Sequence, residues 1–199
     1  MNPSQRLAQQ VAFIAEIDKL KHVQRQTILL DRSRRENDAE HSWHLAMMVL
    51  LLAEHSDQPI NSLRVLKMVL IHDLVEIDAG DTYAYDEAAH HDKSLREQAA
   101  ADRLFSMLPE DQGKEFRALW DEFEERETAD ARFAGAVDRM QPLLHNCLTE
   151  GQTWKAHGVR LGQVIDRCRP IEDGSERLWD YMLNLVDQAV VKGHLDGRS

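Results

Sequence analysis

The sequence predicts an all-α fold, and two observations support this prediction. Apolar residues recur with the spacing of an α-helix through nearly all of the 199 residues. Runs of aromatic or β-branched residues are few, whereas Ala, Leu, Glu, Gln and Arg, which favour helices, are plentiful. Because a chain of this length forms one compact core more readily than two, residues 1–199 are interpreted as a single helical domain.

Three helices are expected in the first part of the chain. The apolar stripe of the first helix consists of Leu7, Val11, Ile14, Ile17 and Leu20. A polar, arginine-rich segment follows and is interpreted as a loop that ends at a helix cap, Asn37 or Asp38. The inward residues of the second helix are Leu45, Met48, Leu51 and Leu52. The third helix begins at Asn61 or Ser62 and ends at Gly80, and its apolar middle predicts that it is the most buried of all.

Further helices are expected in the second part. Pro109 fits the first turn of one helix, and Thr128 opens the next, which Pro142 should kink or close. A short amphipathic segment near residues 157–168 precedes a last helix at about 171–191. The buried face of this last helix is expected to carry Leu178, Met182, Leu185 and Val186.

Charge and cysteine content restrict the partners and the location. The formal net charge is −11 and no basic stripe offsets it, so a nucleic-acid polymer is excluded as a partner, whereas small phosphorylated molecules are not. Cys147 and Cys168 show no CxxC spacing and are interpreted as reduced thiols. No apolar run approaches a membrane span or a signal core, so the expected location is the cytoplasm, without membrane association.

The strongest chemical signal is the pair His72-Asp73 in the most apolar segment. A carboxylate among Ile71 and Leu74 loses hydration worth several kcal/mol unless it is paired or binds a metal. Taken alone, the pair is explained equally well by a buried His and Asp that satisfy each other or a neighbouring Arg.

Two further residues favour a metal. His41 shares a helical stripe with apolar residues, and Asp138 is embedded in another packing face. Burying ionisable groups on three helices costs free energy for each group if they act independently. One cation between the central helices explains all of them together. Two His and two carboxylates suit one divalent transition metal, Mn, Fe, Co, Ni or Zn, and lack the thiolates of a structural zinc site.

The order His41, His72-Asp73, Asp138 carries a family resemblance. Together with the segments AEHSWHLAMM, LIHDLVEIDAGD and ARFAGAVDRMQPLL, it resembles the HD-domain metal-dependent phosphohydrolases, in the branch of the bacterial 5′-deoxynucleotidases and their eukaryotic relatives. The resemblance implies an HD-type helical domain and a homodimer. It also implies hydrolysis of a phosphate monoester, in that branch a deoxynucleoside 5′-monophosphate.

The resemblance also assigns residues around the metal. Glu76 and Asp81 match positions that assist catalysis, and Arg25 matches a phosphate-contacting arginine. Relatives often place a tryptophan near that arginine, whereas this chain has Gln26, so we expect looser selection of the nucleoside. In the expected mechanism the metal binds a phosphate oxygen and a water molecule, which Glu76 orients or deprotonates. Asp81 holds the sugar or protonates the leaving oxygen.

Two alternatives to this function stay open. The substrate could be a nucleoside triphosphate or another phosphorylated metabolite, or the protein could be a dimeric metal-binding protein without turnover. His44 is interpreted as a packing or supporting histidine rather than a ligand. Tyr83 and Tyr85 either contribute to a substrate lid or lie on the surface.

Overall fold

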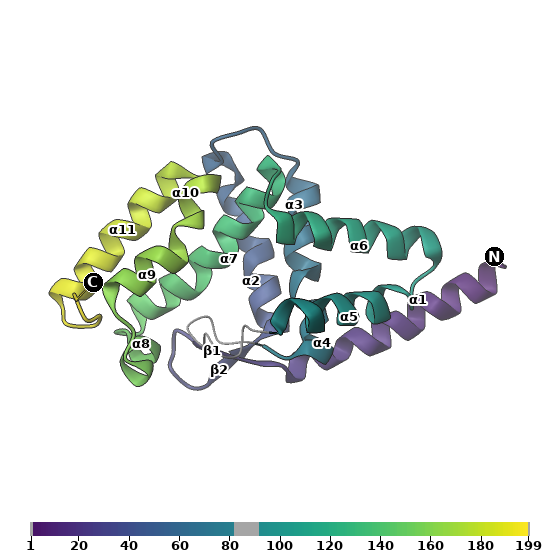
Figure 1. Ribbon diagram of the computed structural model, residues 1–199, viewed down its shortest axis with the longest axis horizontal. Helices are drawn as coiled ribbons and strands as arrows, with labels where there is room; N and C mark the ends of the chain where they lie inside the picture. Colours follow the sequence, from purple (N-terminus) through teal and green to yellow (C-terminus); the bar gives the residue numbers. More distant parts are fainter. Residues whose placement is uncertain (1, 82–91, 199) are drawn as a thin grey trace.

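The computed structural model describes residues 2–81 and 92–198, and nearly all regular structure in them is helical (Figure 1). In the first part, the elements are α1 (Pro3–Ile17), η1 (Asp18–His22), β1 (Gln24–Ile28), β2 (Arg35–Asn37), α2 (Asp38–Leu52), η2 (Ala53–His55), α3 (Ser62–Ile71), η3 (His72–Val75) and α4 (Glu76–Ala79), where η denotes a 3₁₀ helix. In the second part, they are α5 (Lys93–Phe105), α6 (Glu110–Glu125), α7 (Ala129–Leu148), α8 (Gln152–His157), α9 (Leu161–Cys168), α10 (Pro170–Gly174) and α11 (Glu176–Val191). The prediction of an all-α fold is confirmed, and the expected Tyr83–Tyr85 lid lies outside the described residues.

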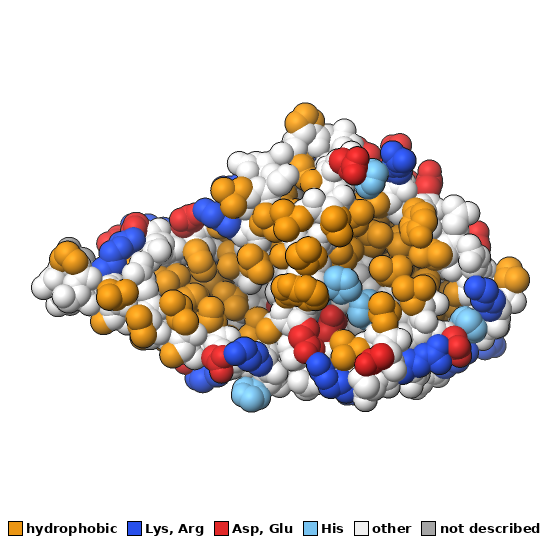
Figure 2. Space-filling view, turned by 180° about the vertical axis from the view of Figure 1, so that it is seen from behind, with side chains coloured by type: hydrophobic (Ala, Val, Ile, Leu, Met, Phe, Trp, Pro, Cys, Tyr) orange, Lys and Arg blue, Asp and Glu red, His pale blue; other side chains and the backbone are white. Residues whose placement is uncertain are grey.

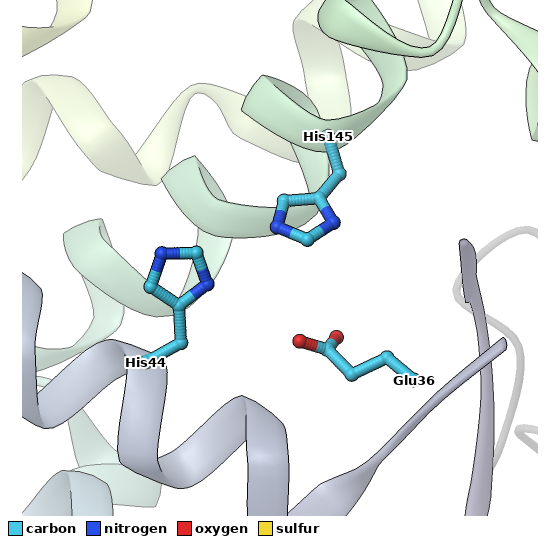
Figure 3. Close-up of side chains that lie close together, drawn as sticks. All are labelled: Glu36, His44 and His145. Carbon is cyan, nitrogen blue, oxygen red and sulfur yellow. The ribbon is translucent and has the colours of Figure 1, made fainter. Parts of the chain in front are cut away.

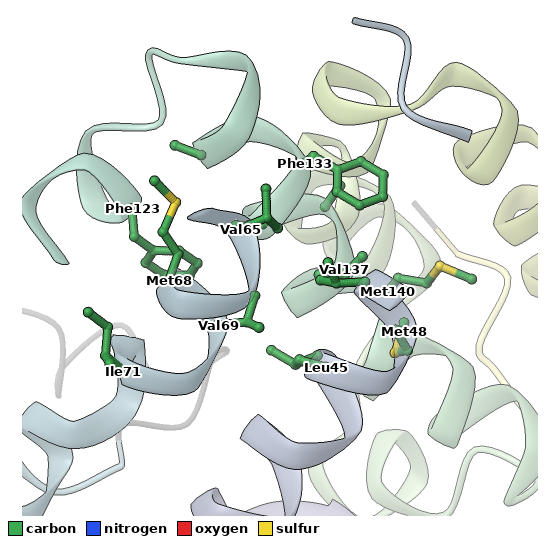
Figure 4. Packing of buried hydrophobic residues seen from close by; sticks show 14 of the residues in the cluster. Leu45, Met48, Val65, Met68, Val69, Ile71, Phe123, Phe133, Val137 and Met140 are labelled. Carbon is green, nitrogen blue, oxygen red and sulfur yellow. The ribbon is translucent and has the colours of Figure 1, made fainter. Parts of the chain in front are cut away.

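The core lies where α2, α3, α6 and α7 pack together (Figure 4). Its central side chains are Leu45 and Met48 of α2, Val65, Met68 and Val69 of α3, Phe123 of α6, and Phe133, Val137 and Met140 of α7. The helix α10 approaches α7 so closely that a Cβ on Gly174 would lie 2.8 Å from the carbonyl oxygen of Arg132. This packing fixes the positions of α2, α7 and the segment formed by α3 and η3, all of which carry buried polar residues.

The predicted helix starts follow from side-chain caps. The Asn37 side chain accepts from the backbone N–H of Glu40 at 3.0 Å, and Glu40 accepts in return from the backbone N–H of Asn37. Asn61 and Thr128 cap α3 and α7 in the same way, each accepting from a backbone N–H three residues ahead. Gly80 follows α4 with a φ of 75°, which confirms that a glycine ends this segment.

Two expected helices are divided in the structure, and another continues past the proline expected to kink or close it. The third is divided, because after Ile71 the chain tightens into the 3₁₀ turn η3 before α4. Pro142 does not close α7, which continues to Leu148. The last helix is also divided: Ser175 caps α11 and donates its hydroxyl to the carbonyl of His55 at 2.6 Å, so a tertiary contact separates α10 from α11.

A short β-hairpin encloses the expected loop: β1 lies before it, and β2 replaces its last residues before the cap. The pair is antiparallel, and Gln24 lies opposite Asn37. Periodicity did not reveal it because two short polar strands carry little apolar signal. The hairpin matters for the site, since it carries Arg25 and Glu36 inward.

Several expected inward residues are exposed. Leu51 has 67% of its side chain exposed, so its assignment to the inward face of the second helix is wrong. The first part of the predicted α1 stripe is exposed as well, with 61% for Leu7 and 63% for Ile14, whereas its last residues, Ile17 and Leu20, contact the core. An apolar stripe shows that a face avoids water, but not whether the same chain covers it. Within the described residues, no helix combines the length and apolarity that a membrane crossing requires.

Candidate metal centre

The four predicted ligands meet between three helical segments. His41 lies on α2, His72 and Asp73 in the turn η3, and Asp138 on α7, and all four are buried. His41 Nε2 lies 3.2 Å from Asp138 Oδ1 and 3.9 Å from Asp73 Oδ2. His72 Nε2 lies 3.0 Å from Asp73 Oδ1 and 3.7 Å from Asp138 Oδ1. The structure thus brings together residues that the sequence places up to 97 positions apart.

Hydrogen bonds on the opposite ring nitrogens orient both imidazoles. His72 Nδ1 donates to the carbonyl oxygen of Val69 at 3.0 Å, which leaves its Nε2 buried without a hydrogen-bond partner. His41 Nδ1 lies 3.1 Å from the side-chain oxygen of Gln141, an acceptor, so this nitrogen carries the proton. Both Nε2 atoms therefore face the carboxylates. Once His72 loses its proton they present two lone pairs, an arrangement of electron-pair donors that a cation stabilises.

The spacing of these atoms fits one metal ion. Ligand atoms that each lie about 2.1 Å from an ion are separated by roughly 3 to 4 Å when they occupy neighbouring or opposite positions. The four separations between imidazole nitrogens and carboxylate oxygens, 3.0 to 3.9 Å, fall within that range, and ligand atoms of His41, His72 and Asp73 lie within 4.8 Å of one another. In the metal-free protein a proton takes the place of the cation: burial alone would lower the pKa of His72, but Asp73 and Asp138 raise it to about 10.

A cavity of about 190 Å³ reaches this centre from outside. It is lined by His72, Asp73 and Asp138, and also by Glu76, Asp81 and Arg25. His41 lies behind them and is fully buried. Six of the seven predicted site residues therefore share one cavity, which leaves room for a small ligand beside the metal.

Glu76 belongs to a group of carboxylates beside the ligands. Carboxylate oxygens of Glu76, Asp73 and Asp38 lie within 4.8 Å of one another, and one oxygen of Glu76 is buried without a hydrogen-bond partner. Burial and these two carboxylates raise the pKa of Glu76 well above its ordinary value. Burial also raises the pKa of Asp81, which lines the same cavity. A carboxyl whose pKa is raised in this way keeps its proton to a higher pH than usual and can serve as a proton donor.

Arg25 reaches the centre from the hairpin. Its Nη1 donates to Asp73 at 2.7 Å and to Asp38 at 3.0 Å. Sequence reasoning treated Asp38 only as a possible cap, whereas its side chain is fully buried and compensates the charge of Arg25. Its position next to the cap Asn37 could not reveal this contact, which joins the strand β1 to the first residue of α2.

Behind His41, Gln141 connects the centre to a second group of polar residues. Its side-chain nitrogen donates to Glu36 at 2.6 Å and lies 3.2 Å from His145 Nε2 and 3.3 Å from His44 Nδ1. Figure 3 shows Glu36, His44 and His145 pointing toward one another. Because the Gln141 amide lies within hydrogen-bond distance of all three, a metal there would have to displace it. His44 thus contacts the amide behind His41, and its assignment as a supporting histidine stays a prediction.

Comparison with known proteins agrees with this geometry. The sequence model of the family described as HD domain matches residues 17–179, which include every residue of the centre. The chain belongs to the HD domain family. This HD domain is similar to the crystal structure of a protein from Magnetospirillum magnetotacticum described as a predicted metal-dependent phosphohydrolase. The identity is 58%, the TM-score is 0.94, and 98% of each chain is covered.

Two named relatives extend the comparison. The HD domain is 30% identical to the 5′-deoxynucleotidase HDDC2 of Bos taurus over 66% of this chain. It is 31% identical to a 5′-deoxynucleotidase of Yersinia pestis over 63% of this chain and 68% of that protein. The match to the bovine protein covers 63% of its length, which is less than two thirds.

Proposed function

We propose that this protein is a metal-dependent phosphohydrolase that releases phosphate from a small phosphate monoester, most simply a deoxynucleoside or nucleoside 5′-monophosphate. The observation that carries the proposal is the convergence of two imidazole nitrogens and two carboxylates beside an accessible cavity. A closed structural site needs no such access, which argues against the alternative of a metal-binding protein without turnover.

One divalent ion of Mn, Fe, Co, Ni or Zn suits the ligands His41, His72, Asp73 and Asp138. When bound, such an ion supplies Lewis acidity for a phosphate oxygen and lowers the pKa of a bound water molecule. The protein holds the ligand atoms in place before binding, because each imidazole is oriented by a hydrogen bond on its other nitrogen.

Glu76 and Asp81 are proposed to move protons. Glu76 is the first residue of α4, directly after the turn that carries two ligands, and its carboxylate lies near that of Asp73, so it can orient a water molecule or take its proton. Asp81 lines the same cavity and can hold a substrate hydroxyl or protonate the leaving oxygen. Arg25 is proposed to contact the phosphate, and its bonds to Asp38 and Asp73 hold the guanidinium at the cavity wall.

A panel of phosphate esters tests the proposal directly. Deoxynucleoside and nucleoside 5′-monophosphates, the corresponding triphosphates and simple sugar phosphates are assayed for phosphate release with added Mn²⁺, Co²⁺ or Mg²⁺. We expect turnover of the monophosphates that stops with chelator and returns with metal. Hydrolysis of triphosphates alone would instead support the nucleoside-triphosphate alternative, and inactivity on every ester would contradict the proposed function.

The assembly proposed is a homodimer of a single domain, residues 1–199, in the cytoplasm. Figure 2 shows hydrophobic side chains gathered across the face opposite to that of Figure 1. Exposed apolar side chains on α1 and α2 are Leu7, Val11, Ile14, Trp43, Met47, Leu50 and Leu51. Since large apolar surfaces of this kind are typical of protein interfaces, a second copy is proposed to cover it. Light scattering should show a dimer in the parent and a monomer in Trp43→Glu; a monomeric parent would contradict it.

A further inference from the structure

Three arginines from different helical segments line the cavity of the metal centre. Arg126 directly follows α6, Arg139 lies on α7 and Arg167 on α9. Arg139 donates from Nη1 to Oδ2 of Asp138 at 3.0 Å, so this arginine directly contacts a proposed metal ligand. The trio Arg126, Arg139 and Arg167 therefore extends from the metal ligand along the cavity wall.

The charges of the trio are poorly compensated. Among the described residues, no carboxylate lies within ion-pair distance of the Arg126 or Arg167 guanidinium, and the Nε atoms of Arg126 and Arg139 are buried without a hydrogen-bond partner. Burial and repulsion from Arg139 lower the pKa of Arg167 to about 10 and also lower the pKa of Arg126. Because guanidinium groups stay protonated at neutral pH, these positive charges persist and favour an anion among them.

The backbone at Arg126 points to a specific need for its side chain. Arg126 ends α6 with a φ of 55° and a ψ of 31°, in the left-handed region where glycine is favoured. Its guanidinium lies against Gly135 of α7, where a Cβ would be 3.4 Å from Nε, and 5.9 Å from the ring centre of Phe123. An arginine thus occupies a position where glycine would end the helix with less strain, and the neighbouring helix has a glycine that leaves room for it.

We propose that the trio binds a second phosphate of the substrate, so that the preferred substrate is a phosphate monoester whose leaving group itself carries a phosphate. This inference rests on the proposed function, in which the metal and Arg25 engage the phosphate that is released. In the reaction, the oxygen of water bonds to phosphorus and the ester P–O bond breaks. The leaving alcohol takes a proton and keeps its own phosphate, which the trio holds.

Kinetics on a matched pair of substrates tests the inference. The parent is assayed on deoxyadenosine 5′-monophosphate and deoxyadenosine 3′,5′-bisphosphate. We expect kcat/KM to be at least about tenfold higher for the bisphosphate, chiefly through a lower KM, because charge-assisted hydrogen bonds contribute this much or more. Arg167→Gln and Arg126→Gly should lose this advantage and retain the rate on the monophosphate. The matched control Arg169→Gln, at an exposed arginine that follows α9, should behave as the parent.

A binding measurement separates this inference from the proposed function. Inorganic phosphate is titrated calorimetrically into protein kept metal-free with chelator, so that the metal makes no contribution. We expect binding to the parent and to Arg169→Gln, and affinity at least about tenfold lower for Arg167→Gln and Arg126→Gly. Arg126→Gly should nevertheless unfold at an equal or higher temperature than the parent, since glycine relieves the strained backbone.

The outcomes are distinct. Equal phosphate affinity in the parent and both variants, or turnover of the monophosphate without any preference for the bisphosphate, would overturn the inference and leave the proposed function intact. Inactivity on all esters would contradict the proposed function, while loss of phosphate affinity in the two variants would still support the trio as a phosphate site.

Discussion

Replacing Gln141 by methionine should weaken metal binding although no ligand is removed. The Gln141 oxygen accepts a hydrogen bond from His41 Nδ1 at 3.1 Å, and this bond keeps the Nε2 lone pair directed at the metal position. Methionine has a similar shape but offers no comparable acceptor. The imidazole can then carry its proton on Nε2, which cannot bind a metal in that form.

The expected magnitude follows from two sets of bonds. A hydrogen-bond partner behind a metal-binding histidine contributes about 10- to 100-fold to metal affinity, or roughly 1.4–2.8 kcal/mol. The variant also loses the 2.6 Å bond from Gln141 to Glu36, whose other oxygen is already buried without a hydrogen-bond partner. Loss of one bond to a carboxylate and one to a neutral group should destabilise the metal-free protein by about 2–4 kcal/mol.

The assay is competition for Zn²⁺ or Mn²⁺ with a chelator of known affinity, combined with elemental analysis and thermal unfolding. The matched control is Gln188→Met, at an exposed glutamine of α11. Parental metal affinity in Gln141→Met would refute the proposed role of Gln141. Two metal ions per chain in the parent would also refute the proposed role of Gln141. The cluster of Glu36, His44 and His145 would then bind a metal in place of the Gln141 amide.

Four further predictions concern the same centre. Asp73→Ala and Asp138→Ala should each lower metal content sharply in elemental analysis, and a full complement of metal in both would disprove the ligand assignment. Glu76→Ala should keep most of its metal but lose hydrolysis by roughly two to four orders of magnitude, so a parental rate would exclude a catalytic role. Arg25→Ala should weaken transition-state binding of several monophosphates by about 1.5–3 kcal/mol whichever base they carry, whereas a base-dependent loss in kcat/KM would argue against a phosphate contact. Because the pKa of His72 is raised to about 10 without metal, binding must displace its proton, and apparent metal affinity should rise about tenfold per pH unit below that value; titrations that show no such rise would contradict it.

The sequence alone sufficed for the features that depend on short-range patterns. Caps such as Asn37, Asn61 and Thr128 act on backbone groups within three residues, so their positions predicted where α2, α3 and α7 begin. The adjacency of His72 and Asp73 within an apolar segment likewise indicated a buried ionic group that needs compensation.

Tertiary structure decided which residues surround those ligands. Gln141 lies 100 positions from His41 and 105 from Glu36, and the arginine trio comes from three separate helical segments. Sequence periodicity does not reveal such contacts. The packing of apolar faces brings distant segments together, and this packing determines which polar side chains meet. The exposure of Leu51 has the same origin: a repeat of apolar residues specifies a face that avoids water, and only the packed fold determines whether this chain or another copy covers it.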